Sequence, residues 1–374
     1  ANYNTTSPVS RPHPWRTKRA ADPGFGKYYR DHYGAAESIP NGYFTSACSP
    51  LVYQDSALPG LSGQILACAP AQNFVHRAEL QRDGVLLNIR RPAGAEKSEF
   101  LASGDIWFHP IHLVIGPEGA IYIADFYREI IEDYSAIPRY LQQQYGLIAG
   151  EDHGRLWRLA HDKMPKVSSK NMAALTVVEL AREVGSPHFW RRQTARRLLI
   201  DRNRVNDGAL AILAKTAVES KDAAGAINSL YTLDGLNLLS AVMIEMALTH
   251  HEPGVRRHAM RLAERRFGEN KTLLRAALRL VDDKSSIVRL QVALSLGEST
   301  DARATAGLVR LATRHGSDEW LNDAILSSLV GRTGRMLTEL LEKPADAARA
   351  RGLVGRLCTA IATRRNAKEF SGAL

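Results

Sequence analysis

Residues 44–159 alternate short apolar runs with glycine- and proline-containing turns, a pattern typical of β-strands. In 73–80 the apolar positions recur every second residue, so that Phe74 and Leu80 share a face, and Asp83-Gly84 then favours a hairpin turn. We predict strands at residues 51–53, 64–68, 73–80, 85–89, 107–108, 112–115, 120–125 and 154–159. Short strands at regular spacing indicate a sandwich, barrel or propeller, and this length suffices for roughly two to three blades of a propeller.

From residue 171 the apolar period changes to that of a helix, and the pattern repeats. Three windows align, at 189–199, 254–264 and 287–297, and 224–233 and 319–329 are degenerate copies. A repeat of this length with two helices per unit is typical of a HEAT-type α-solenoid. Arg256 and Arg289 open the second helix of their units, and we predict that each bonds an Asp or a carbonyl of a neighbouring unit.

These patterns predict a multidomain β + α chain, in which a partial β-propeller, its last blades, precedes an α-solenoid of HEAT-type helical repeats. We place an irregular, loop-rich segment at 1–43 and the terminal blades at 44–163. The solenoid follows at 164–344, and a weakly patterned helical tail at 345–374.

The composition changes this picture little. With 374 residues, 24% of them charged and 45% hydrophobic, the chain is neither a disordered tail nor a fibre, and two domains are expected. The longest apolar stretch, 236–248, is too short to span a membrane and contains Glu245. We identify no signal peptide in the chain.

The charge is uneven. Residues 1–160 carry 15 Lys and Arg against 16 Asp and Glu, whereas residues 161–374 carry the remaining 34 against 23. A basic half indicates a nucleic acid, an acidic partner or a membrane surface, or else an arginine-rich helical face exposed to solvent. Few aromatic residues interleave the arginines of 189–289, which makes single-strand stacking and nucleic acid binding unfavoured.

The three cysteines are too few for a disulfide scaffold. None lies in a CxxCH motif, so the chain has no haem-attachment signal. Cys48 and Cys68 lie in strand-like segments, and they form a possible disulfide if the compartment is oxidising; the alternative is two buried thiols. The His250-His251 pair and His153 lack a metal-ligand partner at a suitable spacing, so we expect these histidines at the surface and predict no metal site on them.

Several ordered motifs resemble the large membrane-bound dehydrogenase-like proteins of planctomycete-type bacteria. The first is Phe-Thr-Ser-Ala-Cys-Ser-Pro-Leu-Val-Tyr at 44–53, and the others lie at 73–77, 99–108, 116–128, 131–132, 154–158 and 232–236. The resemblance covers roughly residues 40–340. It implies a β-propeller similar to soluble quinoprotein sugar dehydrogenases, then HEAT repeats, and often a cytochrome c domain.

On this resemblance the chain would be a periplasmic or exported fragment of a sugar or alcohol dehydrogenase that begins inside its propeller. The intact parent would use pyrroloquinoline quinone (PQQ) and Ca²⁺. The early blades would be missing here, so we predict that the chain alone is not catalytically complete. Its implied partners are the missing blades, a cytochrome domain or another protein, bound through the β edge and the solenoid, with carbohydrate as a further possibility.

The best catalytic candidates are acidic, basic and imidazole side chains that follow strands: Asp105, His109, Asp125, Arg128 and Glu132. Quinone-dependent hydride abstraction needs a general base, a cation near the quinone and oxygen ligands for Ca²⁺. His76 and Arg77 are candidates for cofactor binding. The chain departs from the family at 108–110, where Phe-His-Pro replaces Phe-Arg-Pro, and at 131–134, where Ile-Glu-Asp-Tyr replaces Ile-Glu-His-Pro.

Three alternatives stay open at this stage. Each Asp could instead cap a turn or form a structural ion pair where a blade closes. The chain could be a non-enzymatic scaffold that binds protein or glycan, or a basic HEAT-like protein that binds nucleic acid.

Overall fold

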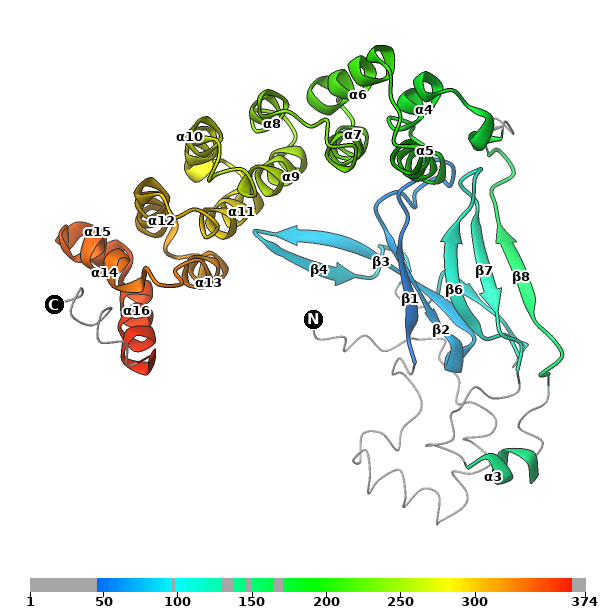
Figure 1. The fold of residues 1–374 in the computed structure, drawn as a ribbon. Coiled ribbons are helices and arrows are strands. Elements are labelled where there is room, and N and C mark those ends of the chain that lie inside the picture. Colours follow the sequence, from blue (N-terminus) through cyan, green and yellow to red (C-terminus); the bar gives the residue numbers. More distant parts are fainter. Residues whose placement is uncertain are drawn as a thin grey trace, which may run out of the picture. The chain divides into compact units, whose positions relative to one another are not determined.

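The computed structural model describes residues 46–95, 98–105, 107–128, 138–144, 150–164 and 171–364. The chain forms two compact units. The β unit comprises residues 1–169 together with 187–190, and the helical unit comprises 170–186 together with 191–374. The chain therefore has a β-sheet region followed by a helical repeat region, as the change of period predicts (Figure 1).

The β unit contains two antiparallel sheets. The strands are β1 Cys48–Val52, β2 Ile65–Ala69, β3 Phe74–Asp83, β4 Leu86–Arg90, β5 Leu101–Ala102, β6 Pro110–Ile115, β7 Ile121–Asp125 and β8 Arg155–Leu159. In the first sheet the order is β1-β2-β3-β4, with β5 also paired to β3, and in the second it is β6-β7-β8 (Figure 1). Neighbouring strands mostly follow one another in the chain because short turns join antiparallel strands.

The hairpin predicted at Asp83-Gly84 is confirmed. Asp83 pairs with Leu86, and Gly84 has a φ of 58°, which lies in the left-handed region that glycine adopts most easily. The strand predicted at 107–108 is wrong. Asp105 Oδ1 accepts a hydrogen bond from the Trp107 N–H at 3.0 Å, and this local bond turns the backbone away from a ladder.

The core of the β unit lies between the two sheets. Leu66 and Val75 of the first sheet meet Ile115 and Ile123 of the second in one buried cluster. Tyr53 is fully buried in this cluster, and its hydroxyl donates to the Gly119 carbonyl at 2.7 Å. Alternating apolar residues on both sheets thus give each a dry inner face.

Residues 187–190 group with the β unit because Asp55 binds them. The buried Asp55 carboxylate accepts hydrogen bonds from the Phe189 N–H at 2.7 Å and from His188 Nδ1 at 3.2 Å. A carboxylate at the first N–H groups of a helix satisfies donors that the helix itself leaves unpaired. Phe189 also packs against the apolar cluster.

The described residues also contain short α-helices. They are α3 Arg139–Gln144, α4 Val177–Glu183, α5 Phe189–Arg202, α6 Asp207–Glu219, α7 Ala223–Gly235, α8 Ala241–Ala247, α9 Pro253–Glu264, α10 Lys271–Arg279, α11 Ser286–Leu296, α12 Ala302–His315, α13 Glu319–Ser327, α14 Thr333–Leu341, α15 Pro344–Arg349 and α16 Arg351–Arg364. Each predicted repeat window falls on a helix. Asn206, Asp222, Ser240 and Asn270 cap their helices by accepting N–H bonds.

The helices of the helical unit form two rows (Figure 1). We call α7, α9, α11 and α13 the second-helix row, because each is the second helix of a repeat. Each packs against the next member of the row, and α6, α8, α10, α12 and α14 pack in the same way in the other row. This stacking is how a solenoid buries faces that a single helix pair leaves open.

Successive repeats bury equivalent positions. Val255 and Ala259 of α9 correspond to Val288 and Val292 of α11, each 33 residues later, and all four are fully buried. The apolar period therefore encodes the stacking surface.

The structural role predicted for the repeated arginines is confirmed, but only Arg256 reaches a neighbouring repeat, because Arg289 bonds the turn of its own repeat. Arg256 donates two hydrogen bonds to the Asp283 carboxylate, at 2.7 and 2.8 Å, and also reaches the carbonyls of His250 and His251. Arg289 donates to the Asp283 carbonyl at 2.7 Å. Both guanidinium groups therefore fasten inter-helix turns.

One surface prediction is wrong. His250 is only 4% exposed, because its Nε2 bonds the Ser220 carbonyl at 3.0 Å and its Nδ1 accepts the Glu252 N–H at 3.1 Å. His251 stacks on the His250 ring with a centroid separation of 4.3 Å. Within the described residues, no helix is both long enough and apolar enough to cross a bilayer.

Candidate functional site

The most densely bonded acidic group of the β unit is Asp125, at the end of β7. Its carboxylate is fully buried and accepts four hydrogen bonds. Oδ1 receives the backbone N–H groups of His109 and Tyr127, at 2.9 and 3.1 Å. Oδ2 receives Arg155 Nε at 2.7 Å and Trp157 Nε1 at 3.0 Å. These bonds occupy the lone pairs that a general base would use.

Arg155 connects this carboxylate to Asp105, whose Oδ2 lies 3.0 Å from the guanidinium. The guanidinium also lies over the Tyr127 ring, 3.9 Å from its centroid, and near the Trp157 ring at 5.1 Å. Burial lowers the pKa of Arg155, but the hydrogen bonds and negative charges of Asp125 and Asp105 raise it by more. The pKa of Arg155 therefore lies above its usual value. We call Asp105, Asp125, Arg155 and Trp157 the β cluster; it is an ion-pair and hydrogen-bond network within the β unit.

The other predicted catalytic residues take separate positions. His109 is buried, and its Nδ1 donates to the Pro70 carbonyl at 2.8 Å. Arg128 lies over the Phe126 ring, 4.8 Å from its centroid. Glu132 lies outside the described residues. The structure therefore brings Asp105, Asp125 and the His109 backbone together, and it directs the His109 ring elsewhere.

The two predicted cofactor-binding residues also have partners within the β unit. His76 Nδ1 lies 2.7 Å from Glu99 Oε2, and Arg91 donates to Glu99 Oε1 at 2.7 Å. The Glu99 carboxylate is completely buried between these two groups. Arg77 lies over the Phe100 ring at 5.6 Å. Cofactor binding by His76 and Arg77 stays a prediction.

The two cysteines predicted to pair lie opposite each other. Cys48 and Cys68 are register partners in β1 and β2, and both are free thiols in this structure. Burial raises the pKa of the Cys68 thiol to about 12, and the neighbouring Cys48 adds to the rise. A thiol with such a pKa is a poor nucleophile. Disulfide formation stays a prediction.

The β cluster is suited to holding strands together rather than to proton transfer. Asp105 is the candidate acid with most access, since its side chain is 40% exposed. Among the described residues, no group of three His, Cys, Asp or Glu side chains is arranged to hold a metal ion. Ca²⁺ binding, which the resemblance implies, stays a prediction.

Sequence reasoning missed three side chains of these networks: Arg155, Trp157 and Glu99. Arg155 and Trp157 are two residues apart in β8, so the alternation of a strand places them on one face. That spacing was the available signal, but nothing in the sequence identified Asp125 as the group they share.

The helical unit has a different polar cluster, on the second-helix row. The Tyr231 hydroxyl of α7 and His258 Nδ1 of α9 are 3.0 Å apart, and the Arg196 guanidinium lies 5.7 Å from the Tyr231 ring. Burial lowers the pKa of His258, and the positive charges of Arg257 and Arg261 lower it further. Burial raises the pKa of Tyr231, while Arg261, Arg196 and Arg265 oppose that rise. Four arginines thus act electrostatically on this pair.

Three of these arginines form what we call the α9 arginine stripe: Arg257, Arg261 and Arg265. They are exposed and recur every four residues, so they lie about 6 Å apart along one helix face. Within the described chain none of the three forms an ion pair, whereas the adjacent Arg256 and Arg266 are paired with Asp283 and Asp234. The stripe therefore presents positive charge to solvent.

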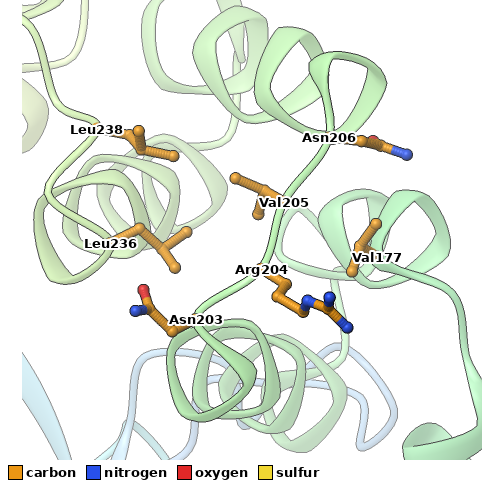
Figure 2. A pocket seen from close by; sticks show the side chains of 7 residues that line it. All are labelled: Val177, Asn203, Arg204, Val205, Asn206, Leu236 and Leu238. Atoms are coloured by element: carbon orange, nitrogen blue, oxygen red, sulfur yellow. The ribbon is translucent and has the colours of Figure 1, made fainter.

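A surface hollow of about 550 Å³ lies elsewhere on the helical unit. Its lining residues are Val177, Asn203, Arg204, Val205, Asn206, Leu236 and Leu238. In Figure 2 the 203–206 loop runs through the middle, with Leu236 and Leu238 on its left and Val177 on its right. Arg204 is its one titratable residue, so the hollow lacks a convergent acid–base pair.

Comparisons with known proteins match the two regions separately. Residues 9–163 match a family model described as a domain of unknown function, DUF7133, and residues 240–329 match the model of HEAT repeats. The HEAT prediction is thereby confirmed for that part of the solenoid. The propeller blades and the dehydrogenase family stay predictions, since neither model names them.

No curated protein matches the chain. Among solved structures, one crystal structure of an engineered protein shares 15% identity, with a TM-score of 0.30, and covers 49% of this chain and 98% of its own. A second engineered protein shares 16% identity, with a TM-score of 0.26, and covers 49% and 96%. Residues 9–163 are thus similar to the DUF7133 model and residues 240–329 to HEAT repeats.

Proposed function

We propose that the chain is a protein-binding scaffold whose second-helix row is the docking surface. The observation that carries this proposal is the exposure of large apolar side chains beside arginines without acidic partners. Leu294 of α11 is 42% exposed and Trp320 of α13 is 54% exposed; α11 packs against α9, and α13 packs against α11. Exposed aromatic, leucine and arginine side chains together are typical of interface cores.

The repeat architecture supports the same function. HEAT repeats commonly mediate protein interactions, and a solenoid offers a long continuous surface without a deep pocket. The buried positions of a repeat are restricted by stacking, whereas its exposed positions are available for recognition. The polar network of the β unit would then hold strands together rather than carry out chemistry.

The sugar dehydrogenase activity implied by the resemblance is a second proposal. The observation that favours it is the gathering of Asp105 and Asp125 around Arg155. The four hydrogen bonds on Asp125 favour the scaffold, because a base must have a lone pair available.

The scaffold proposal is tested by selecting binders to the complete chain from a displayed library of random peptides. We expect peptides whose binding protects amides of the second-helix row, α7, α9, α11 and α13, from hydrogen exchange. Selection of peptides that protect only the β unit, or of none, would contradict the proposal. The matched control is the same selection against a chain with Trp320→Ser and Leu294→Ser, which should enrich fewer of the same peptides.

A further inference from the structure

The second-helix row keeps its buried positions from repeat to repeat but changes its exposed ones. Each arginine of the α9 arginine stripe has an equivalent position 33 residues later, in α11 or just after its end. These equivalent positions are exposed or half-buried. The three equivalent pairs are Arg257 and Leu290, Arg261 and Leu294, and Arg265 and Glu298. Since these side chains do not pack in the core, stacking does not explain why α9 is basic there and α11 apolar.

The arginines of the α9 arginine stripe are available to negative charge from outside the unit. Arg257, Arg261 and Arg265 have no acidic partner among the described residues, while other arginines of the same unit are paired with Asp282, Asp283 and Asp323. Each exposed guanidinium is a planar donor that matches a carboxylate with two hydrogen bonds. The stripe is therefore suited to a row of carboxylates.

The neighbouring α11 offers apolar contact. Ile287, Leu290 and Leu294 recur at helical spacing on its accessible face, and α11 packs directly beside α9. Arginines and leucines thus lie in two parallel strips. A partner that covers both must carry acidic side chains on one flank and apolar side chains on the next.

We propose that the α9 and α11 faces bind an acidic amphipathic helix of a protein partner. Acidic residues one turn apart in such a helix repeat about every 6 Å, the spacing of the α9 arginine stripe. A nucleic acid fits this surface less well. Next to the arginines of α9 lie the leucines of α11 rather than more basic residues, and the acidic Glu298, just after α11, and Asp323, in α13, would repel phosphates. The inference rests on the proposed scaffold function and specifies its partner.

The test uses the complete chain and a fluorescent peptide helix of about 18 residues, with Glu one turn apart on one flank and Leu one turn apart on the adjacent flank. Binding is measured by fluorescence anisotropy at low and high salt. We expect saturable binding that weakens as salt rises. A peptide with Lys in place of each Glu, or Ser in place of each Leu, should bind at least about tenfold more weakly.

Two variants test whether the peptide binds to the α9 and α11 faces. Arg257→Glu, Arg261→Glu and Arg265→Glu together should weaken binding by about 100-fold, and Leu290→Ser with Leu294→Ser by about tenfold. The matched control is Arg275→Glu with Arg279→Glu, two exposed arginines one turn apart on α10 of the other row. That control should stay within about twofold of the wild type. Unchanged circular dichroism and melting confirm that each variant folds.

Three results would overturn the inference. The acidic peptide does not bind, the α10 control weakens binding as much as the stripe variant does, or an oligonucleotide of equal charge binds more tightly and depends on the same arginines. If the peptide fails while the library selection yields other peptides on the second-helix row, the scaffold proposal stands and only the partner class is wrong.

Discussion

Arg155 in the β unit and Arg261 in the helical unit are the same side chain in opposite settings. Arg155 is enclosed by two carboxylates and two aromatic rings, so its charge is used within the fold. Arg261 is exposed and has no acidic partner in the described residues. An ion pair inside a unit fixes strands, whereas an arginine without one is available to a partner.

The contrast also exists within one helix. Arg256 and Arg257 are adjacent in α9, yet only Arg256 reaches Asp283. One helical position turns a side chain by about 100°, which separates the inter-repeat turn from solvent. The net positive charge of the second half therefore has a structural part and an available part.

The largest expected effect breaks the β cluster. Asp125→Ala removes four hydrogen bonds and leaves Arg155 and Trp157 without their buried acceptor. We expect a loss of about 4 kcal/mol in the free energy of unfolding of the β unit. Urea unfolding followed by tryptophan fluorescence measures it. Asp105→Ala is the control, and because Asp105 is partly exposed it should cost about 1 kcal/mol or less. Equal losses would show that Asp125 is not the centre of the network.

The next effect separates the two adjacent arginines. Arg256→Met leaves the nearly buried Asp283 carboxylate without its bidentate partner and should lower the unfolding free energy of the helical unit by about 3 kcal/mol. Arg257→Met should change it by about 0.5 kcal/mol or less, because the side chain is exposed. Urea titration followed by circular dichroism compares the two variants. If Arg257→Met is as costly as Arg256→Met, the stripe is structural rather than available for binding.

A smaller effect concerns acidification of the helical unit. Burial lowers the pKa of His250, His258 and His315 below their ordinary value of 6.5. Below that value the unfolded state binds protons that the folded state resists, so stability is retained above about pH 6.5 and falls as the pH drops through it. The protection factors of the α9 amides, which are corrected for the intrinsic pH dependence of exchange, should therefore fall on acidification. His258→Gln should reduce this pH dependence, and a stability that rises on acidification would contradict the assignment.

The smallest effect tests the catalytic side of the comparison. Added PQQ and Ca²⁺, with a dye acceptor and a panel of sugars, should give no turnover by this chain. The reason is that four hydrogen bonds already occupy the lone pairs of Asp125. Robust dye reduction that is lost in Asp105→Asn would contradict this prediction and favour the dehydrogenase over the scaffold.

Much of the fold follows from local patterns. Asp83-Gly84 predicted the hairpin, and the repeated Val-Arg at 255–256 and 288–289 predicted both helices and the structural arginines. The strand at 101–102 was missed because two residues carry no period, and the strand predicted at 107–108 was wrong because the Asp105 side chain captures the Trp107 N–H. His250 was placed at the surface because a short sequence does not show that Ser220 lies beside it.

The sequence by itself determined the change from strand to helix period, the HEAT repeat and the excess of positive charge in the second half, because each is a property of neighbouring residues or of a fixed spacing. Only the tertiary structure decided which charges have partners. Arg155 meets Asp125 over 30 residues and Arg256 meets Asp283 over 27, while Arg257, one residue along, meets no acid in the described chain. Pairing across such separations depends on how strands and helices stack, and stacking is a property of the whole unit rather than of any segment.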